Sequence, residues 1–289
     1  MEGRVSIEDK TMMDRSEKQR DIPEISVIMG IHNERYPGAV RHAVDSILSQ
    51  EGVELELILY DDGSDPDVVR EIASLAEKDR RIILAGEGEQ RGLAYSLNAC
   101  LAYARAPLLA RMDADDVALP QRLKKERDYL KRHPDIDWVG CNAGIYDEQG
   151  EWGHSTRPED PGTGDYLRYS PFIHPTVMFR RRVLQEVGGY DTGEKAQLLE
   201  DYELFLRLWR KGHRGANLQE ELLLYYIDRG HYHIRGWKQR VNEMKLRYTC
   251  YLRSGVLFPA GWLYGLRPIA GALIPAQILR RMKERKRQL

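Results

Sequence analysis

Residues 25–65 read ISVIMGIHNERYPGAVRHAVDSILSQEGVELELILYDDGSD, and this stretch sets the architecture of the chain. Two short apolar runs, 25–31 and 55–60, flank an amphipathic stretch at about 38–50. Short apolar runs bounded by turn residues are typical of buried strands, and an amphipathic stretch of this length is typical of a helix lying on a sheet. The stretch therefore predicts a β-α-β unit with two parallel strands.

The same alternation continues downstream of residue 65. A helical stretch ending at Lys78 precedes the run RIILAG at 81–86, and a helix at about 92–104 precedes PLLARM at 107–112. This βαβαβαβ order predicts an α/β fold, with a Rossmann-like, mainly parallel sheet and helices on both faces. In open sheets of this kind, ligands bind beyond the carboxyl ends of the strands.

Polar or turn-forming residues follow each of the four predicted strands. Because parallel strands end at one edge of the sheet, we expect these residues to line one crevice. Two alternatives stay open: the second segment could be a turn built by Asp and Gly, and the fourth could be a solvated loop or a helix N-cap before Pro120. The four segments are HNER (32–35), DDGSD (61–65), GEGEQRG (86–92) and DADD (113–116).

The DADD segment places three carboxylates, Asp113, Asp115 and Asp116, side by side in the sequence. A nucleoside diphosphate would be repelled by bare carboxylates, so acidic residues at such a site imply a bridging hard divalent cation. Mg²⁺ keeps several waters and needs only one or two protein carboxylates besides phosphate oxygens. The spacing of Asp113 and Asp115 allows one to bind the metal and the other to bind a ribose hydroxyl.

The composition argues against a nucleic-acid-binding protein, a disulfide-rich protein and a zinc protein. The 289 residues include 44 Lys or Arg and 45 Asp or Glu, so no bulk positive charge marks a nucleic-acid binder. Cys100, Cys141 and Cys250 are far apart and lack metal-ligand spacing, which argues against a disulfide framework or a zinc site. We therefore expect a cytoplasmic protein.

The two ends of the chain differ from the middle. The first 21 residues are polar and charged, which predicts a flexible leader before a domain that begins near Ile22. Near the other end, apolar segments 255–266 and 268–279 are each too short to span a bilayer, and six Lys or Arg lie in the last ten residues. This pattern favours adsorption on an anionic membrane surface, and the alternative is a helical hairpin packed on the domain with a solvated basic tail.

Several ordered motifs resemble one family, the family 2 glycosyltransferases of the GT-A fold, over roughly residues 22–228. A single D-x-D is a weak signal, but the order and spacing of these motifs together are specific. The chain has neither the long hydrophobic spans nor the Q-x-x-R-W motif of the processive synthases, so we expect transfer of single sugars. The motifs are ISVIMGIHNER, LILYDDGSD, RGLAYSLNACLAYARAPLLARMDADD and LLEDYELFLRLWRKG.

The resemblance implies roles for individual residues. It implies that Asp201 is the general base of an inverting transfer, with Glu200 beside it, although this pair is also favoured at an ordinary helix start. It implies Asp115 as the likelier metal ligand and Asp113 as the ribose and phosphate neighbour that also approaches the metal. It implies Mg²⁺ or Mn²⁺ as cofactor. The remaining nucleotide-sugar-binding residues that it implies are His32, Asn33, Glu34, Asp61 or Asp62 at the base, and Arg91 and Gly92 beside the diphosphate.

The resemblance also implies an organisation and partners. We expect a GT-A domain at 22–230, with a nucleotide-binding half (22–116) and an acceptor half (117–230), followed by a helical extension at 231–289 that lies on the inner face of a membrane. The expected partners are a nucleotide-sugar, for which we expect a UDP-sugar, and a saccharide or lipid-linked saccharide of cell-surface polysaccharide or lipopolysaccharide. Two other functions stay open: a sugar-nucleotide pyrophosphorylase and a non-catalytic nucleotide-sugar-binding protein.

Overall fold

The computed structural model describes residues 22–193, 196, 199–229 and 236–271. The predicted leader at 1–21 and the last part of the predicted tail, 272–289, lie outside the described residues.

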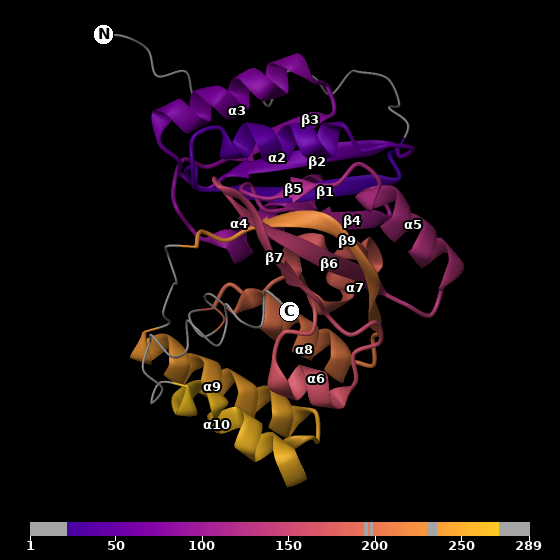
Figure 1. Ribbon diagram of the computed structural model, residues 1–289, viewed down its shortest axis with the longest axis vertical. Coiled ribbons are helices and arrows are strands. Elements are labelled where there is room, and N and C mark those ends of the chain that lie inside the picture. The colour runs from indigo at the N-terminus through magenta and orange to yellow at the C-terminus, as the bar shows by residue number, and fades with distance from the viewer. Residues whose placement is uncertain (1–21, 194–195, 197–198, 230–235, 272–289) are drawn as a thin grey trace.

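The first half of the described chain alternates strands and helices, as the apolar runs predicted. The four strands pair in parallel in the order β3-β2-β1-β4 (Figure 1). The predicted alternation is confirmed. Its physical reason is that each run is apolar enough to be buried within the sheet. The elements are β1 (Ile25–Ile31), α2 (Ala39–Leu48), β2 (Leu55–Asp61), α3 (Pro66–Lys78), β3 (Ile82–Gly86), α4 (Leu93–Tyr103) and β4 (Leu108–Arg111).

The second half extends the same sheet with mixed strand directions. Beyond β4 the order is β8-β6-β9-β5, with β7 paired to β6, and β8 runs antiparallel to both β4 and β6. The elements are β5 (Val117–Ala118), α5 (Arg122–Arg132), β6 (Trp138–Asp147), β7 (Gly150–Ser155), α6 (Thr163–Arg168), η1 (His174–Thr176), β8 (Met178–Arg180), α7 (Arg181–Val187), α8 (Glu200–Arg210), β9 (Gly215–Tyr226), α9 (Trp237–Arg253), η2 (Leu257–Gly261) and α10 (Trp262–Ala270).

Two expectations about this half are wrong in detail. The apolar stretch 172–181 predicts one strand, but only Met178–Arg180 pairs, because Pro175 has no N–H to donate and lies in a 3₁₀ turn. The stretch 147–172 is rich in Gly, Pro and charge, which predicts a long connection, but it contains β7 and α6.

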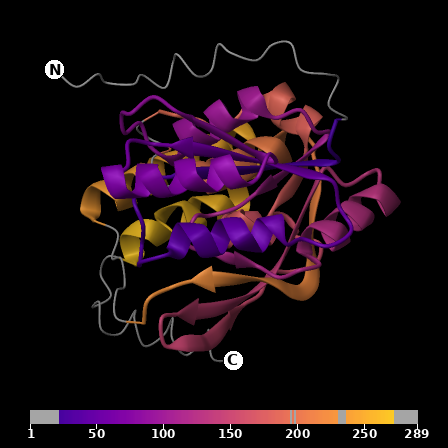
Figure 2. The same cartoon turned by 90° about the horizontal axis from the view of Figure 1, so that it is seen from above.

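The sheet is covered on both faces. Alternate residues of β1 point to opposite sides: Val27 and Met29 pack with α2 and α3, whereas Ile28 packs with α4 and α8. Figure 2 shows this layering from above. Ligands are therefore excluded from both faces and have access at the strand ends.

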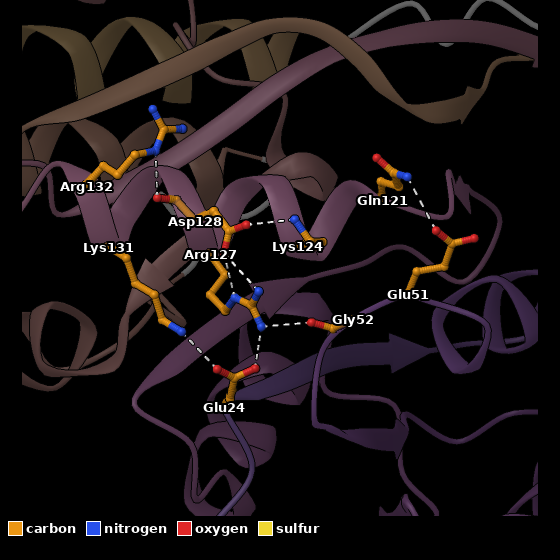
Figure 3. Close-up of polar contacts among 9 residues, drawn as sticks. All are labelled: Glu24, Glu51, Gly52, Gln121, Lys124, Arg127, Asp128, Lys131 and Arg132. Carbon is orange, nitrogen blue, oxygen red and sulfur yellow. Dashed lines mark hydrogen bonds and ion pairs between the residues drawn. The ribbon is translucent and has the colours of Figure 1, made fainter.

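Figure 3 shows how α5, the helix that follows DADD, is attached to the start of β1. The carboxylate of Glu24 accepts hydrogen bonds from Lys131 at 2.9 Å and from Arg127 at 2.5 Å. Arg127 also donates to the carbonyl of Gly52 at 2.9 Å. Such surface ion pairs each contribute about 1 kcal/mol or less, but together they hold α5 against the sheet.

The last two described helices form an antiparallel pair at the end of the molecule opposite α3 (Figure 1). The hydroxyl of Tyr248 in α9 donates to the carbonyl of Trp262 in α10 at 2.8 Å, and Arg240 donates to the carbonyl of Pro268 at 2.9 Å. Residues early in one helix thus meet residues late in the other.

The expected division of the C-terminal apolar region at Arg267 is wrong. Helix α10 runs through both Arg267 and Pro268 and ends two residues later, so the proline removes a hydrogen bond only from the last turn. Within the described ranges, every helix is too short or too polar to cross a bilayer.

Candidate active site

The strand register brings the predicted polar segments to one edge of the sheet. Ile31 of β1 lies opposite Asp61 of β2, and Asp61 lies opposite Gly86 of β3. On the other side of β1, Ile28 pairs with Arg111 of β4. The segments that follow these strands are consequently neighbours, as the pattern predicted.

Hydrogen bonds tie the loop after β1 to the loop after β2. The N–H of Asn33 donates to Ser64 Oγ at 3.0 Å, and the N–H of Asp65 donates to Asn33 Oδ1 at 2.7 Å. Asn33 has a φ of 58°, a left-handed conformation that Asn tolerates better than most residues. His32 is exposed beside this junction, with Nδ1 3.0 Å from the carbonyl oxygen of Asp62. The predicted HNER and DDGSD segments therefore form one structural unit.

Asp61 and Asp62 are both buried, and both carboxylates accept backbone N–H groups. Asp62 Oδ1 accepts from Arg91 at 2.7 Å and Asp62 Oδ2 accepts from Gly92 at 2.8 Å. Asp61 accepts only through Oδ1, from Ser64 at 3.0 Å. Asp62 thus positions the loop before α4, whereas Asp61 retains a carboxylate oxygen without a hydrogen bond from the described residues.

Close backbone contact holds these loops together. Gly63 has a φ of +74°, and a Cβ there would lie 2.9 Å from the backbone nitrogen of Gln90. A side chain at Gly63 would push the two loops apart.

Glu34 and Arg91 occupy less central places than the other predicted residues. Both carboxylate oxygens of Glu34 accept N–H groups at the start of α2, from Gly38 and Val40 at 3.3 Å each. The side chain of Arg91 is exposed and lies over the ring of Tyr95, 4.7 Å from its centroid. Glu34 therefore acts as a helix cap, and Arg91 lies at the rim.

The three carboxylates of DADD converge. One oxygen each of Asp113, Asp115 and Asp116 lie within 4.8 Å of one another. Asp116 is fully buried; its Oδ1 accepts the N–H of Tyr226 at 2.8 Å, while its Oδ2 has no hydrogen-bond partner among the described residues. Three hard oxygen donors at this spacing, one of them buried and unsatisfied, fit a divalent cation such as Mg²⁺ or Mn²⁺.

Crowding and burial raise the pKa values of two carboxyl groups in this cluster. Burial, together with the charge of Asp113, raises the pKa of Asp115 to about 6. Burial, reinforced by Asp113 and Asp115, also raises the pKa of Asp116 well above its usual value. A bound cation would stabilise the charged forms of these carboxylates.

Arg111, which the sequence reasoning missed, is the buried counterion of this cluster. It is only 2% exposed and pairs through Nη2 with Asp113 Oδ1. Its Nε and Nη1 have no hydrogen-bond partner among the described residues. The signal that could have revealed it is a charged residue inside the apolar run PLLARM, directly before DADD.

A cavity of about 290 Å³ lies next to the acidic cluster. It brings Asp113 together with Glu200 and Asp201, which begin α8 far downstream in the sequence. Burial raises the pKa of Glu200. The other lining residues are Leu93, Arg111, Arg157, Ser170, Phe172, Ile173, His174, Pro175 and Tyr225.

The surroundings of His174 on this wall disfavour its charged form. Burial and the nearby charge of Arg111 lower its pKa well below the usual range, and its Nε2 lies 3.0 Å from the hydroxyl of Tyr190. As far as the described residues show, the cavity lining does not reach the remaining predicted residues, which lie at the neighbouring strand ends. These are His32, Asn33, Glu34, Asp61, Asp62, Arg91, Gly92 and Asp115.

Comparisons with known proteins bear on this site. Residues 26–188 match the family model described as Glycosyl transferase family 2. The chain is 33% identical over 267 residues to the putative glycosyltransferase EpsE of Bacillus subtilis (strain 168), covering 91% of this chain and 94% of the relative. It is 35% identical over 214 residues to the O-antigen biosynthesis glycosyltransferase WbnJ of Escherichia coli, covering 72% and 81%.

Among solved structures, the chain is similar to the mannosyltransferase PcManGT from Pyrobaculum calidifontis in complex with GDP-Man and Mn²⁺. The TM-score is 0.59 at 19% sequence identity, covering 90% of this chain and 79% of the other. At this identity the similarity establishes a common fold.

Proposed function

The chain belongs to glycosyl transferase family 2 and is a glycosyltransferase, and from this premise we propose that it transfers a single sugar, with inversion, from a nucleotide-sugar to a saccharide or lipid-linked saccharide. The acceptor in this proposal belongs to cell-surface polysaccharide or lipopolysaccharide, since one relative is named for O-antigen biosynthesis. The observation that carries the proposal is the single cavity that holds Asp113 of the acidic cluster together with Glu200 and Asp201.

Asp115 and Asp113 would hold the divalent cation, Mg²⁺ or Mn²⁺. The support is the convergence of hard carboxylate oxygens and the Mn²⁺ named in the complex of the similar mannosyltransferase. When bound, such a cation neutralises the diphosphate and so stabilises it as a leaving group. Arg111, which is buried, keeps the partly exposed Asp113 oriented through their ion pair.

The donor in this proposal is a UDP-sugar that lies along the edge formed by the ends of β1 to β4. Asp61 would accept a hydrogen bond from the base, because one of its oxygens is not engaged by the described backbone. Asp62 would act indirectly, by holding Arg91 and Gly92 in place beside the diphosphate. His32, Asn33 and Glu34 support the same edge: His32 is exposed on it, Asn33 ties its loops together, and Glu34 caps α2.

The acceptor would enter the cavity beside α8. Asp201 would take the proton from the acceptor hydroxyl while that oxygen attacks the anomeric carbon from the face opposite the nucleotide. Glu200, whose pKa is raised by burial, lies beside Asp201 in the same cavity and is the alternative base. A single displacement assisted by one base inverts the anomeric centre.

The experiment that tests this proposal is a donor screen on the full chain. UDP-sugars and GDP-mannose are incubated with Mg²⁺, Mn²⁺ or a chelator, and release of nucleoside diphosphate is measured. We expect release from a UDP-sugar that depends on the cation, and a product of opposite anomeric configuration by NMR once an acceptor is supplied. Retention of configuration, or equal release with chelator, would contradict the proposed mechanism.

A further inference from the structure

The charges of the chain are segregated. Residues 236–289 contain twelve Lys or Arg and two Asp or Glu, although the whole chain has 44 and 45. The residues before this segment are therefore acidic in balance. In the described part of the segment, 236–271, the single acidic residue is Glu243, which is buried and accepts hydrogen bonds from Arg247. The surface of α9 and α10 consequently presents basic charges with no exposed carboxylate of its own among the described residues.

Helix α10 packs on the domain through small residues and the half-buried Tyr264, and it exposes large apolar residues on its other side. Gly261, Gly265 and Pro268 are buried, and a Cβ at Gly265 would lie 2.8 Å from the ring of Tyr248 in α9. On the outward side, Trp262, Leu263 and Leu266 are 42%, 57% and 41% exposed. A helix that packs on a water-soluble domain normally buries its large apolar residues and exposes polar ones. The large apolar residues on the outward side of α10 therefore indicate that this face meets a non-aqueous partner.

Two more exposed apolar side chains lie at the turn between the helices. Leu252 at the end of α9 is 66% exposed and Phe258 before α10 is 73% exposed. Away from α9 and α10, the described chain has only Ile22 and Tyr103 as exposed large apolar residues. Exposed apolar surface gathered on one element of a protein marks an interaction site.

The helix pair is also tied to the wall of the candidate active site. Arg247 of α9 donates to the carbonyl of Leu167 at 2.9 Å, and Arg267 of α10 donates to the carbonyl of Arg168 at 2.5 Å. Both carbonyls belong to α6, and the chain after α6 supplies Ser170 and Phe172 to the cavity. A partner surface that binds α9 and α10 would thereby lie at a fixed position relative to the acceptor side of the cavity.

We propose that the outward face of this helix pair docks the enzyme on an anionic lipid leaflet. The face consists of Leu252, Phe258, Trp262, Leu263 and Leu266, with Arg253 and Arg267 exposed around it. Its apolar side chains enter the boundary between head groups and acyl chains, and the flanking cations bind anionic head groups. The basic residues at 280–289 add to the same attraction. The inference rests on the proposed function, because a lipid-linked acceptor is presented at such a surface.

Vesicle cosedimentation of the full chain tests this docking. Phosphatidylcholine vesicles with and without phosphatidylglycerol are compared at low salt, where electrostatic binding is least screened. The variant L263E/L266E places two carboxylates on the face, and I22E is the matched control on an exposed apolar residue far from it. We expect tight binding of the parent to anionic vesicles, a loss of about tenfold or more in the double variant, and no change in I22E.

Three outcomes would overturn the inference. One is unchanged vesicle binding by the double variant, and another is equal binding of the parent to neutral and anionic vesicles. The third is a shift from dimer to monomer in gel filtration of the double variant without vesicles, since the face would then join two copies of the chain.

Nucleoside diphosphate release measured on the same samples separates this inference from the proposed function. Failure to bind vesicles with donor turnover intact contradicts the docking alone. Vesicle binding with no turnover of any donor contradicts the proposed function alone. Because both substituted leucines are exposed, thermal unfolding of L263E/L266E should match that of the parent.

Discussion

The carboxylate of Asp62, the residue directly after β2, accepts the backbone N–H of Gly92, the residue before α4, at 2.8 Å. Its other oxygen accepts the N–H of Arg91 at 2.7 Å. These two charge-assisted hydrogen bonds to a buried carboxylate fix the loop after β2 to the start of α4. Both carboxylate oxygens of Asp62 therefore already accept hydrogen bonds from the protein backbone.

The first prediction concerns this junction. Asp62→Ala leaves two backbone N–H groups without a partner and should lower the free energy of unfolding by about 2 to 4 kcal/mol. It should also weaken nucleotide binding, because the loop at 87–92 loses its anchor. Urea unfolding and calorimetric titration with a nucleoside diphosphate measure the two effects. Asp67→Ala, at an exposed carboxylate in the first turn of α3, is the control, and a parent-like Asp62→Ala would contradict the anchoring role.

The second prediction concerns the metal. Asp115→Ala removes a carboxylate from the cation and should abolish the difference in nucleotide affinity between Mg²⁺ or Mn²⁺ and chelator, because the diphosphate is then poorly compensated. Turnover should fall with it. Calorimetry is the measurement, and Asp67→Ala, at an exposed carboxylate outside the acidic cluster, is the control. Nucleotide binding that stays cation-dependent at parent affinity in Asp115→Ala would remove Asp115 from the metal site.

The third prediction separates binding from chemistry at Asp201. Asn has nearly the size of Asp but takes no proton, so Asp201→Asn should keep cation-dependent donor affinity while transfer falls by about 10² to 10⁴-fold. Glu200→Gln should have a smaller effect on transfer. If Asp201→Asn transfers at the parent rate and Glu200→Gln does not, the base is Glu200.

The fourth prediction concerns the support beneath the acidic cluster. Arg122 and Glu126 form an ion pair with neither side chain exposed, and Arg122 also donates to the carbonyl of Arg111 at 2.8 Å. Arg122→Met leaves a buried carboxyl without its cation and should cost about 3 to 5 kcal/mol in unfolding free energy. The double variant R122M/E126L should recover most of that loss, because it leaves no buried charge. Additive losses in urea unfolding would show that the two residues do not act as a pair.

The stability loss caused by Arg122→Met should depend on pH, because Glu126 titrates. Burial already raises the pKa of Glu126 to about 7 in the parent, and loss of the Arg122 cation should raise it further. A carboxyl whose pKa is higher in the folded state stabilises the fold below its unfolded pKa, and this contribution is lost as pH rises through the folded pKa. The deficit of Arg122→Met relative to the parent should therefore be larger at pH 8 than at pH 5. An equal deficit at both pH values would mean that Glu126 does not titrate in this range.

The parallel strands of the first half were predictable because burial on both sheet faces leaves continuous apolar runs in the sequence. The predicted run 25–31 coincides with β1, and the run 55–60 differs from β2 by one residue. The strand predicted at 172–181 was wrong because apolar composition alone does not distinguish a 3₁₀ turn around Pro175 from a paired strand. The paired part, β8, depends on partners from distant parts of the chain.

The position of the acidic segments after the strands can be read from local composition, because strand ends are marked by the change from apolar to polar residues. How those acids are used depends on the packing of distant parts of the chain. The structure shows Asp62 bonded to the protein's own backbone, Arg111 buried against Asp113, and Asp113 sharing a cavity with Asp201. Hydrogen-bond partners and cavities depend on which distant segments pack together. In this chain, β8 pairs with β4, and α8 packs on the sheet. This packing brings Asp201 into the same cavity as Asp113. No local pattern of residues predicts contact between segments so far apart in the sequence.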